Sequence, residues 1–420
     1  MTPDSAVDDR RWPLVVIADD LSGAAECAAV LPGRARILLG PAVPVSPGET
    51  PVIDLDSRRL TASGAARLVA RTVRRHAVAG TRLLKKADSL LRGRFAAETS
   101  AFAAGAGGLV LALAVPAAGR TVRDGVVRLH GVPLHRTDAW HGEPGQAPRS
   151  VTEALGGADA TVLTLDRVRA GTTRLERCMR AALVGGAAVV CDAETDADLD
   201  AVAAAVNRLP HGVRAVGAGG LAAALGRLGG PAAPRAVPAR APGGPRPVVV
   251  VVGTAHPGAV AQIAQLTRHG ARHIELPAAS LLAPVGGGRS AALASAAPGR
   301  APVTVVSIAG TPAADPSDAP RLARALARTV AGTLPEDADL VLTGGETARR
   351  VLDELAVTAL LPIGQVHHGA VHCRTADGRG VVTRPGGFGG PDSLLRMVGA
   401  LHTEQDRAPR APHASDGGTR

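Results

Sequence analysis

The feature that most constrains the fold of this chain is the alternation of short apolar runs with longer stretches of helical pattern. Runs that suit buried strands occupy residues 14–18, 82–87, 109–115, 161–165, 188–191 and 213–216. Helical stretches lie between most of these runs, for example at 23–31, 94–104 and 199–207. This order is typical of a largely parallel sheet covered by helices, and a β-hairpin is expected at 126–129.

A segment rich in proline interrupts the alternation between residues 229 and 246. Proline denies this segment a helix or an interior strand, so we interpret it as a linker. A second alternating series then begins with five consecutive valines at 248–252, which suit a strand buried on both faces. The series continues with apolar runs at 303–308 and 340–342, a hairpin at 371–383 and a last helix from Pro391.

At 420 residues the chain is too long for one ordinary core, and the interruption suggests where it divides. We predict one α/β domain at 1–228, a linker at 229–246, a second α/β domain at 247–402 and a disordered tail at 403–420. Each domain is expected to contain a mainly parallel sheet flanked by helices, with the active site in the cleft between the domains.

The formal net charge of +10 raises the question of nucleic-acid binding. The arginines are spread along the whole chain, and no basic run is interleaved with aromatic side chains that could stack on bases. A basic surface suits an anionic small molecule equally well. We therefore expect small-molecule partners and no nucleic acid, which remains the minor hypothesis.

The cysteines and the N-terminal segment bear on the location of the protein. The four cysteines form neither a metal-binding pair nor a disulfide framework; they are Cys27, Cys178, Cys191 and Cys373. The N-terminus lacks the basic start and apolar core of a signal peptide, and no apolar run is long enough to span a bilayer. We expect a cytoplasmic protein with no membrane segment. The number of subunits stays open, with a homodimer as one option.

Only two lysines occur in the chain, side by side at Lys85 and Lys86, and the other 45 of the 47 basic residues are arginine (47 − 2 = 45). Lysine is a compact charge on a flexible stem, whereas arginine is a planar fork. A chain that avoids lysine is expected to keep one where an ammonium is needed, although chance placement on a solvated surface is the plainer alternative. Asp88, Ser89 and Arg92 follow at once, where a strand should give way to a helix, and this favours a functional role.

Other polar side chains in the first half also follow apolar runs. Asp19 and Asp20 come after the run at 14–18, and Arg58 comes after a short run at 51–55. Ligands of open parallel sheets bind beyond the carboxyl ends of the strands, so we expect these side chains, with Lys86 and Arg92, to surround a small hydroxylated anion.

The two adjacent aspartates are expected to divide their tasks. One would cap the next helix, and the other would hold a hydroxyl or accept its proton, with Asp20 favoured for the chemical role. For Arg58 a plain surface position is nearly as well supported. The segment 116–121, which follows another apolar run, is predicted to be a loop at the same edge of the sheet.

In the second half the segments that follow apolar runs are rich in glycine and almost free of charge; they are 253–258, 343–347 and 384–392. Each leads from a strand into a helix, where free backbone amides and the helix dipole attract phosphate. One such segment would be weak evidence, but three favour the phosphates of a nucleotide.

Other phosphate and metal motifs are missing. A Walker A loop requires a lysine, and none lies in this half; the dinucleotide-binding pattern Gly-x-Gly-x-x-Gly does not follow the first strand. The spacing of His256, His367 and His368 does not suggest a zinc site, and we predict no metal site among the candidate residues.

These segments, in this order, resemble the four-carbon acid sugar kinases, which include threonate, erythronate and 3-oxotetronate kinases. The most specific matches are the runs at 17–24 and 86–93, and further matches lie at 116–121, 344–348 and 386–389. The likeness extends over nearly the whole chain, from Ile17 to about Val398. It implies that residues 1–228 bind the sugar acid and that residues 247–402 bind the nucleotide.

The resemblance implies transfer of a phosphoryl group from ATP, with Mg²⁺, to a terminal hydroxyl of a small sugar acid such as threonate, erythronate or 3-oxotetronate. It implies catalytic roles for Asp20, Lys86 and Asp88. The residues that it implies for the sugar acid are Asp19, Asp20, Arg58, Lys86, Asp88, Ser89 and Arg92. Those that it implies for ATP are Thr254, Gly344, Gly345, Glu346, Thr347, Gly386, Gly387, Phe388 and Gly389.

The chain departs from the family pattern at five positions: the family usually has Thr at Leu90, Ser at Ala218, Glu at Gln365, Lys at Arg384 and Asp at Gly390. Arg384 keeps the positive charge, but two carboxylates are lost. Two alternatives therefore stay open. One is a kinase for a different small hydroxy acid, and the other is a catalytically weakened protein that binds ATP and a sugar acid.

Overall fold

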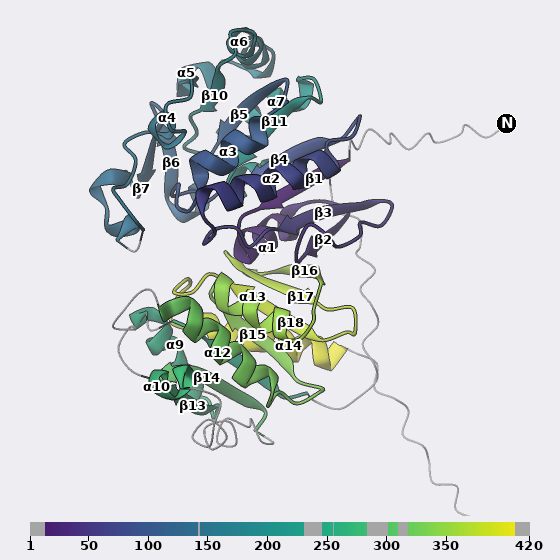
Figure 1. Ribbon diagram of the computed structural model, residues 1–420, viewed down its shortest axis with the longest axis vertical. Helices are drawn as coiled ribbons and strands as arrows, with labels where there is room; N and C mark the ends of the chain where they lie inside the picture. The colour runs from purple at the N-terminus through teal and green to yellow at the C-terminus, as the bar shows by residue number, and fades with distance from the viewer. Residues whose placement is uncertain are drawn as a thin grey trace, which may run out of the picture. The chain divides into compact units, whose positions relative to one another are not determined.

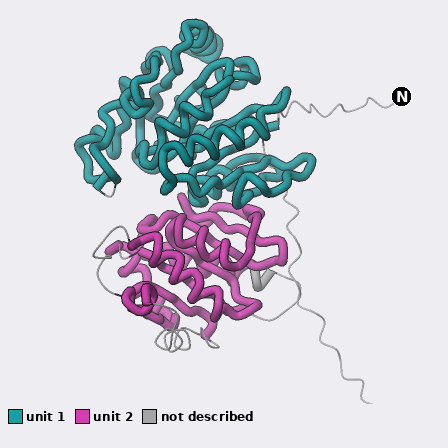
Figure 2. The backbone as a smooth tube through the Cα atoms, viewed as in Figure 1, with its two compact units in different colours: residues 1–235 teal, residues 236–420 magenta. Residues whose placement is uncertain are grey.

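The computed structural model describes residues 13–141, 143–230, 246–254, 256–283, 301–309 and 318–407. These residues alternate between strands and helices, as Figure 1 shows, so the predicted α/β class is confirmed. The chain divides into two compact units, Met1–Arg235 and Ala236–Arg420 (Figure 2). Most of the predicted linker lies outside the described residues. The last helix, predicted to start at Pro391, runs over Ser393–Arg407 and so continues five residues into the predicted tail at 403–420. The rest of that tail also lies outside the described residues.

The described part of unit 1 contains a sheet of parallel strands in the order β2-β3-β1-β4-β11-β5-β10-β9. The strands are β1 (Leu14–Ala18), β2 (Arg34–Leu38), β3 (Glu49–Asp54), β4 (Arg82–Lys86), β5 (Gly108–Ala112), β9 (Ala160–Leu163), β10 (Ala188–Cys191) and β11 (Val213–Gly217). In the register, Ala18 of β1 lies opposite Asp54 of β3 and Lys86 of β4. The three central strands therefore end at the same level.

Helices cover both faces of this sheet; they are α1 (Leu21–Val30), α2 (Ala62–His76), α3 (Phe95–Ala103), α4 (Val151–Ala154), α5 (Leu165–Val168), α6 (Thr172–Val184), α7 (Asp196–Arg208) and α8 (Gly219–Leu228). Helices α2 and α3 pack side by side (Figure 1), while α1 packs beside α8, α8 beside α7 and α7 beside α6. Right-handed crossovers place the α2–α3 pair on one face and the α1–α8–α7–α6 row on the other.

A small antiparallel sheet follows β5 and corrects two predictions. The strand predicted at 109–115 ends at Ala112, because Val115 turns away and exchanges backbone hydrogen bonds with Arg120. The segment predicted to be a loop at 116–121 contains the short η1 (Pro116–Ala118) and the start of β6 (Arg120–Arg123). Strand β6 pairs with β7 (Val126–Leu129), as the predicted hairpin requires, and β7 pairs with β8 (Val132–Pro133), before the short η2 (Leu134–Arg136) and η3 (Asp138–Trp140).

The hairpin predicted at 126–129 is a single strand, β7, which has a tight turn at each end. Asp124 and Gly125 both have positive φ (54° and 70°), and so do His130 and Gly131 (49° and 81°). Consecutive residues with positive φ are typical of the tight two-residue turns that suit the twist of β-hairpins. Asp192 adds two hydrogen bonds, to the amides of Asp124 (2.6 Å) and Gly125 (2.9 Å), and so holds the first turn against the main sheet.

The described part of unit 2 has strands in the order β13-β14-β12-β15-β18-β17-β16. These are β12 (Val248–Val252), β13 (Arg272–Pro277), β14 (Val303–Ala309), β15 (Asp339–Thr343), β16 (Ala359–His367), β17 (Ala370–Arg374) and β18 (Gly380–Arg384). The first five strands in this order, from β13 to β18, are parallel. Strand β17 runs antiparallel to both β18 and β16. The predicted hairpin at 371–383 is thus β17 and β18, and Gly378, with φ 86°, lies in its turn.

Helices of unit 2 pack in two groups: α9 (Pro257–Arg268) contacts α14 (Ser393–Arg407), and α12 (Ala319–Ala331) contacts α10 (Ala278–Leu282) and α13 (Gly345–Glu354). The five valines of β12 are fully buried, as predicted for a strand covered on both faces. Val248, Val250 and Val252 belong to one apolar cluster with residues of α9 and α14, among them Ile263, Leu266, Leu394 and Leu401.

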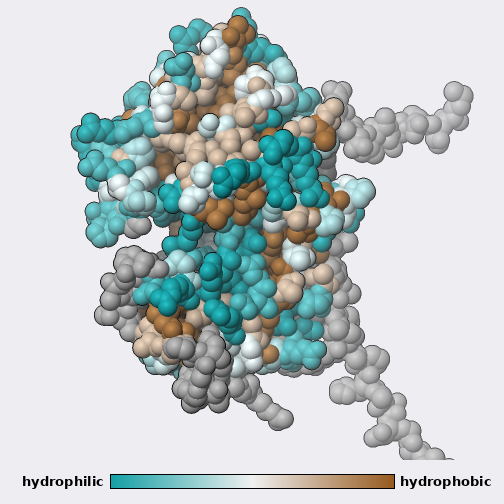
Figure 3. All heavy atoms as spheres, viewed as in Figure 1, coloured by the Kyte–Doolittle hydropathy of each residue, from teal (hydrophilic) through white to brown (hydrophobic). Residues whose placement is uncertain are grey.

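On the face drawn in Figure 3, hydrophobic residues lie among hydrophilic ones. Large apolar side chains that are exposed come from separate elements, for example Val78, Val184 and Val260. Within the described residues, no helix has both the length and the apolar character needed to cross a membrane.

The two units share one strand arrangement. The order β2-β3-β1-β4 in unit 1 has its counterpart in β13-β14-β12-β15 in unit 2. In unit 1 the helix that follows β1 lies on one face of the sheet, and the connection from β3 to β4 crosses the other face. In unit 2 the same holds for the helix after β12 and for the connection from β14 to β15. The chain therefore leaves the neighbouring strands β1 and β4, and likewise β12 and β15, toward opposite faces of the sheet. This opens a crevice at the strand ends, where sheets of this kind bind ligands.

Candidate active site

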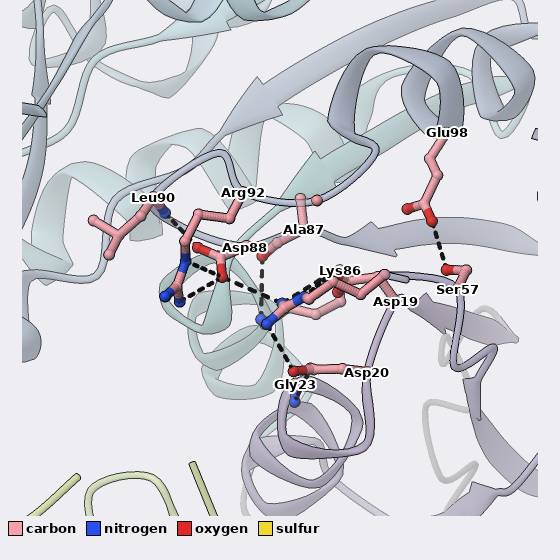
Figure 4. Close-up of polar contacts among 12 residues, drawn as sticks. Asp19, Asp20, Gly23, Ser57, Lys86, Ala87, Asp88, Leu90, Arg92 and Glu98 are labelled. Carbon is pink, nitrogen blue, oxygen red and sulfur yellow. Dashed lines mark hydrogen bonds and ion pairs between the residues drawn. The ribbon is translucent and has the colours of Figure 1, made fainter. Parts of the chain in front are cut away.

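In unit 1 the residues after β1, β3 and β4 form one group of charged side chains, which we call the charged cluster: Asp19, Asp20, Arg58, Asp88 and Arg92. Figure 4 shows Asp20, Lys86, Asp88 and Arg92 gathered near the ends of these strands. They come from segments up to 73 residues apart in sequence (92 − 19 = 73) and meet because the central strands end at one level. The expectation that these side chains lie close together is confirmed.

Arg58 lies at the centre of the cluster and contacts three carboxylates. Its Nε and Nη2 lie 3.0 and 2.9 Å from Asp19 Oδ2, its Nη1 lies 3.0 Å from Asp20 Oδ2, and its Nη2 lies 3.2 Å from Asp88 Oδ2. Burial acts to lower the pKa of Arg58, but the three carboxylates outweigh it and raise that pKa well above its usual value. The alternative of a plain surface arginine is wrong, because Arg58 joins the three loops.

Asp88 is held as a carboxylate by its neighbours. Arg92 donates to Asp88 Oδ2 from Nε (3.0 Å) and Nη2 (2.7 Å), and the amide of Leu90 donates to Oδ1 (2.7 Å). Burial alone would raise the pKa of Asp88, but Arg58 and Arg92 together lower it well below its ordinary range. A carboxylate stabilised in this way is a weak proton acceptor and is suited to orienting cations.

The two adjacent aspartates differ from the expected division of tasks. Asp20, which was favoured for chemistry, is also the residue that caps α1, since its Oδ1 accepts from the amide of Gly23 (2.8 Å). Asp19 is buried, and its Oδ1 has no hydrogen-bond partner in the described part of the chain. The helix cap thus uses one oxygen of Asp20, and its other oxygen faces Arg58.

The environment also separates the two aspartates electrostatically. Burial is the largest influence on both. For Asp19 the cations Arg58, Lys85 and Lys86 outweigh burial and lower the pKa. For Asp20 burial prevails over the pull of Arg58, and the negative charge of Asp19 adds to it, so the pKa of Asp20 is raised. Within this group Asp20 is therefore the carboxylate best able to accept a proton.

The two lysines point to opposite faces of β4, as successive residues of a strand must. Lys85 Nζ lies 2.8 Å from Glu98 Oε2, and Glu98 also accepts from Ser57 Oγ, away from the charged cluster (Figure 4). Lys86 Nζ lies 3.5 Å from Glu26 Oε2 and donates to the carbonyl of Ala87 (3.1 Å). Lys86 thus belongs to the site, whereas Lys85 joins β4 to α3.

The ammonium of Lys86 explains why glycine occupies position 23 in the run at 17–24. A Cβ at Gly23 would come within 3.0 Å of Lys86 Nζ and 2.9 Å of Asp20 Oδ1. Nearby acids, Glu26 foremost, overcome the opposing effect of burial and raise the pKa of Lys86 above its ordinary value. A permanent cation is therefore held against the start of α1.

Sequence reasoning missed Glu26 and Glu98, which partner the two lysines. Each is the only charged residue of an otherwise apolar or neutral helix, α1 and α3 respectively. That isolation was a signal, because a lone carboxylate in such a helix needs a buried partner.

The last predicted sugar-acid residue, Ser89, contacts a residue from the small antiparallel sheet. Its hydroxyl accepts from Nη1 of Arg120 (2.6 Å). Leu90, where the family pattern has threonine, is buried, and its carbonyl accepts from Trp140 Nε1 (2.7 Å). The small sheet and the segment after it therefore form one side of the charged cluster.

In unit 2 the glycine-rich segments that follow β12, β15 and β18 also come together. A Cβ at Gly386 would lie 3.6 Å from Thr254 Cγ2 and 3.9 Å from the Cα of Gly344. A Cβ at Gly253 would lie 2.0 Å from Thr347 Oγ1. The three segments are thus close enough for their backbones to surround one ligand, as expected for bound phosphates.

The first turn of α13 is open to an anion. Its N-cap is Gly344, whose φ of 85° favours glycine, and no side chain of the described structure caps it. His256, by contrast, caps α9 by accepting from the amide of Gly258 (3.1 Å), and its ring would touch a Cβ at Gly387. His256 is therefore a turn residue beside the glycine-rich segments.

Arg384 does not present its charge at the surface of the segment that follows it. It is fully buried; its guanidinium donates to the carbonyl of Phe388 and to Gln262 Oε1, and burial lowers its pKa to about 10. Gln262 in turn donates from Nε2 to the carbonyl of Gly390 (2.9 Å). The pair supports the glycine-rich segment from behind, and sequence reasoning missed Gln262.

Among the described residues, no group of three or more histidine, cysteine, aspartate or glutamate side chains is arranged to hold a metal ion. In the charged cluster this has a visible cause, since the guanidinium of Arg58 lies between the carboxylates of Asp19, Asp20 and Asp88.

Comparison with known proteins agrees with this division of chemistry. Residues 14–225 match a family described as the sugar-binding N-terminal domain, and residues 249–394 match the nucleotide-binding C-terminal domain. The chain is similar to the D-threonate kinase of Cupriavidus necator, with 36% identity over 94% of this chain and 99% of the relative. It is also similar to the D-threonate kinase of Bordetella bronchiseptica, with 33% identity over 92% of this chain and 96% of the relative.

A solved structure from Salmonella typhimurium LT2 shares the fold, with a TM-score of 0.77 and 20% identity over 92% of this chain and 98% of that one. Taken with the named relatives, the two domain matches define an enzyme, a kinase that acts on a hydroxyl group. The chain belongs to the four-carbon acid sugar kinase family.

Proposed function

We propose that this protein transfers the γ-phosphoryl group of ATP to a terminal hydroxyl of a four-carbon sugar acid such as D-threonate, erythronate or 3-oxotetronate. Two relatives named D-threonate kinase, at 36% and 33% identity, support this substrate class. The observation that carries the proposal is the position of Asp20, a carboxyl group with a raised pKa beside Arg58 and Lys86 at the ligand-binding edge of the sheet.

The proposed chemistry needs one proton acceptor and several fixed charges. The acceptor hydroxyl oxygen forms a bond to the γ-phosphorus while the bond from that phosphorus to the β–γ bridging oxygen breaks and ADP leaves. The hydroxyl proton passes to the carboxylate of Asp20. Lys86 supplies positive charge near the reacting atoms, and Asp88, with its lowered pKa, orients Arg58 and Arg92.

The segments after β12, β15 and β18 would bind ATP through their backbone amides. The close approach of Gly344, Gly386 and Thr254 supports this, because side chains larger than these would fill the space beside the phosphates. Mg²⁺, when bound, would neutralise charge on the phosphates, and it is commonly held by one or two carboxylates together with the substrate. Glu346 and Asp392 are the carboxylates of these segments and would take that role.

The domain assignment follows from the same features. We propose that residues 1–228 bind the sugar acid and that residues 247–402 bind ATP. The expectation that the two ligand sites face a common cleft stays a prediction, as do the cytoplasmic location and the homodimer.

A panel of three- to six-carbon sugar acids, assayed for ADP release and for the mass of the product, tests the proposal. We expect the highest kcat/KM with a four-carbon acid, and a product heavier by one phosphoryl group. Failure of every acid to release ADP or to gain a phosphoryl group would overturn it.

The alternative of a catalytically weakened binding protein rests on the carboxylates missing at Gln365 and Gly390. One observation argues against it: a Cβ at Gly390 would lie 3.1 Å from Asp392 Oδ1, so a carboxylate is present beside that position. Calorimetry that shows binding of both ATP and an acid, without turnover, would favour the alternative.

A further inference from the structure

One cation beside the charged cluster has no carboxylate within ion-pair distance in the described part of the chain, although the charges of Asp88 and Glu26 act on it. Arg58 contacts three carboxylates, Arg92 contacts Asp88, and Lys86 contacts Glu26. Arg120 makes no ion pair with any described residue, although its guanidinium donates to Ser89 Oγ at 2.6 Å, and Ser89 follows Asp88 directly. The positive charge of Arg120 is therefore available to a ligand.

Arg120 is also half-buried, and its backbone is fixed in position. Its Nε is buried and has no hydrogen-bond partner among the described residues. Its backbone is held by two hydrogen bonds with Val115, at 2.7 and 3.1 Å. The preceding turn is equally constrained, since Gly119 has φ 64° and a Cβ there would lie 2.3 Å from His130 Nδ1. A half-buried guanidinium with an unpaired nitrogen on a rigid support is costly unless an anion completes it.

We propose that Arg120 binds the carboxylate of the sugar acid and so selects acids over neutral polyols. The inference rests on the proposed function and deepens it. Arg58 and Arg92 are unsuited to this task because protein carboxylates already occupy them. A guanidinium matches a carboxylate through paired hydrogen bonds, and Ser89 holds the fork in position from one side.

The proposed role of Arg120 also defines the direction in which the sugar acid would bind. Asp20, the proposed proton acceptor, would repel a substrate carboxylate, whereas Arg120 attracts it. The acid would therefore bind with its carboxylate toward the small sheet and its far hydroxyl toward Asp20. The proposed orientation places the terminal hydroxyl, rather than the carboxylate, at the start of α1.

Kinetics of Arg120→Gln with D-threonate, and with threitol as the neutral four-carbon analogue, test the inference. We expect KM for D-threonate to rise about 30-fold or more, since one partner of a desolvated charge pair is lost, while kcat at saturating acid changes far less. Turnover of threitol should be unchanged. Arg120→Lys, which keeps a charge without the fork, should fall between the wild type and Arg120→Gln.

Arg123→Gln is the matched control, because Arg123 lies on the same strand, is 57% exposed and pairs with Glu194 instead. It should leave both kinetic constants unchanged. An unchanged KM in Arg120→Gln would overturn the inference. So would a loss of kcat shared equally by D-threonate and threitol, which would instead assign Arg120 to the transferring phosphoryl group.

Calorimetry separates this inference from the proposed function. If the wild type binds D-threonate without phosphorylating it, the proposed function fails, while weaker binding by Arg120→Gln would still support the carboxylate contact. If either substitution lowers the Tm, the comparison of Arg120→Lys with Arg120→Gln at a temperature where both are folded decides the outcome.

Discussion

Unit 1 and unit 2 arrange their central strands in the same order, yet they place opposite chemistry at the ends of those strands. In unit 1 the first helix, α1, is capped by the carboxylate of Asp20, and charged side chains occupy the space beyond the strands. In unit 2 the helix α13 begins at Gly344 without a side-chain cap in the described structure, and glycines leave its amides accessible. One strand arrangement therefore presents charged side chains at the proposed sugar-acid site and free backbone at the proposed nucleotide site.

The difference teaches how a helix N-terminus is assigned to a ligand. A capping carboxylate satisfies the first amides and repels anions, so an acidic cap directs the site toward hydroxyl groups and cations. An uncapped start keeps its dipole and its amides for phosphate. The predictions below change one side of this comparison at a time.

The largest effect is expected at the acidic cap. Asp20→Asn keeps a side chain that caps α1 well, but it removes the proton acceptor, so kcat should fall by about 10²- to 10⁴-fold while the Tm stays close to that of the wild type. Steady-state kinetics and thermal unfolding measure the two effects. Asp166→Asn, in the exposed first turn of α5, is the control and should change neither.

The pH dependence of the wild type gives a second reading of the same residue. The proton acceptor must be ionised, and the pKa of Asp20 is raised from its ordinary 3.8. The kcat should therefore fall as the pH drops through a value above 3.8. A fall of kcat centred at or below pH 3.8 would contradict the role of Asp20 as proton acceptor. So would the same fall of kcat in Asp20→Asn.

A smaller effect is expected at the glycine-rich segments. Gly386→Ala adds a methyl group between Thr254 and Gly344 without forcing an unusual φ, so it should weaken ATP binding by about 10-fold, the cost of one lost hydrogen bond to a charged group. Gly364→Ala, in β16 with no atom within 4 Å of the added Cβ, is the matched control. Equal ATP affinities for the two variants, measured by calorimetry, would show that this space is not the phosphate site.

The smallest effect concerns a third helix start, that of α8. Its N-cap is Ala218 in an extended conformation, where the family pattern has serine, and no described side chain caps it. Ala218→Ser should stabilise unit 1 by about 1 kcal/mol and raise the Tm by about 2–4 °C. Ala218→Cys is the control, because cysteine is similar in size but a poor hydrogen-bond acceptor, and it should not raise the Tm. If it raises the Tm as much as serine does, packing rather than capping is responsible.

Much of the fold could be predicted, because its central strands are marked locally. Strands β1, β10 and β12 have the predicted bounds, since each is an uninterrupted apolar run that ends at polar or glycine residues. Strands β2, β13 and β16 were missed. β2 and β13 mix arginine with apolar residues, and β13 is half exposed at the end of the order in unit 2. Such strands owe their conformation to a neighbour rather than to their own pattern.

The candidate site could be predicted as a set of residues but not as a set of contacts. The rule that ligands bind beyond the strand ends was enough to select Asp19, Asp20, Arg58 and Asp88 as neighbours. It could not assign their partners. Glu26 and Glu98 were absent from the predicted set, and Arg120 was included only as part of the segment 116–121. These residues lie in helices and a hairpin whose packing is not encoded in any local spacing.

The pair of lysines shows where inference from residues alone stops. The order of amino acids was sufficient to say that Lys85 and Lys86 point in opposite directions, because a strand alternates its side chains with a period of two. It could not say which direction leads to the ligand. That depended on the faces to which the crossovers carry α1 and α3, and so on long-range packing that brought Glu26 to one ammonium and Glu98 to the other.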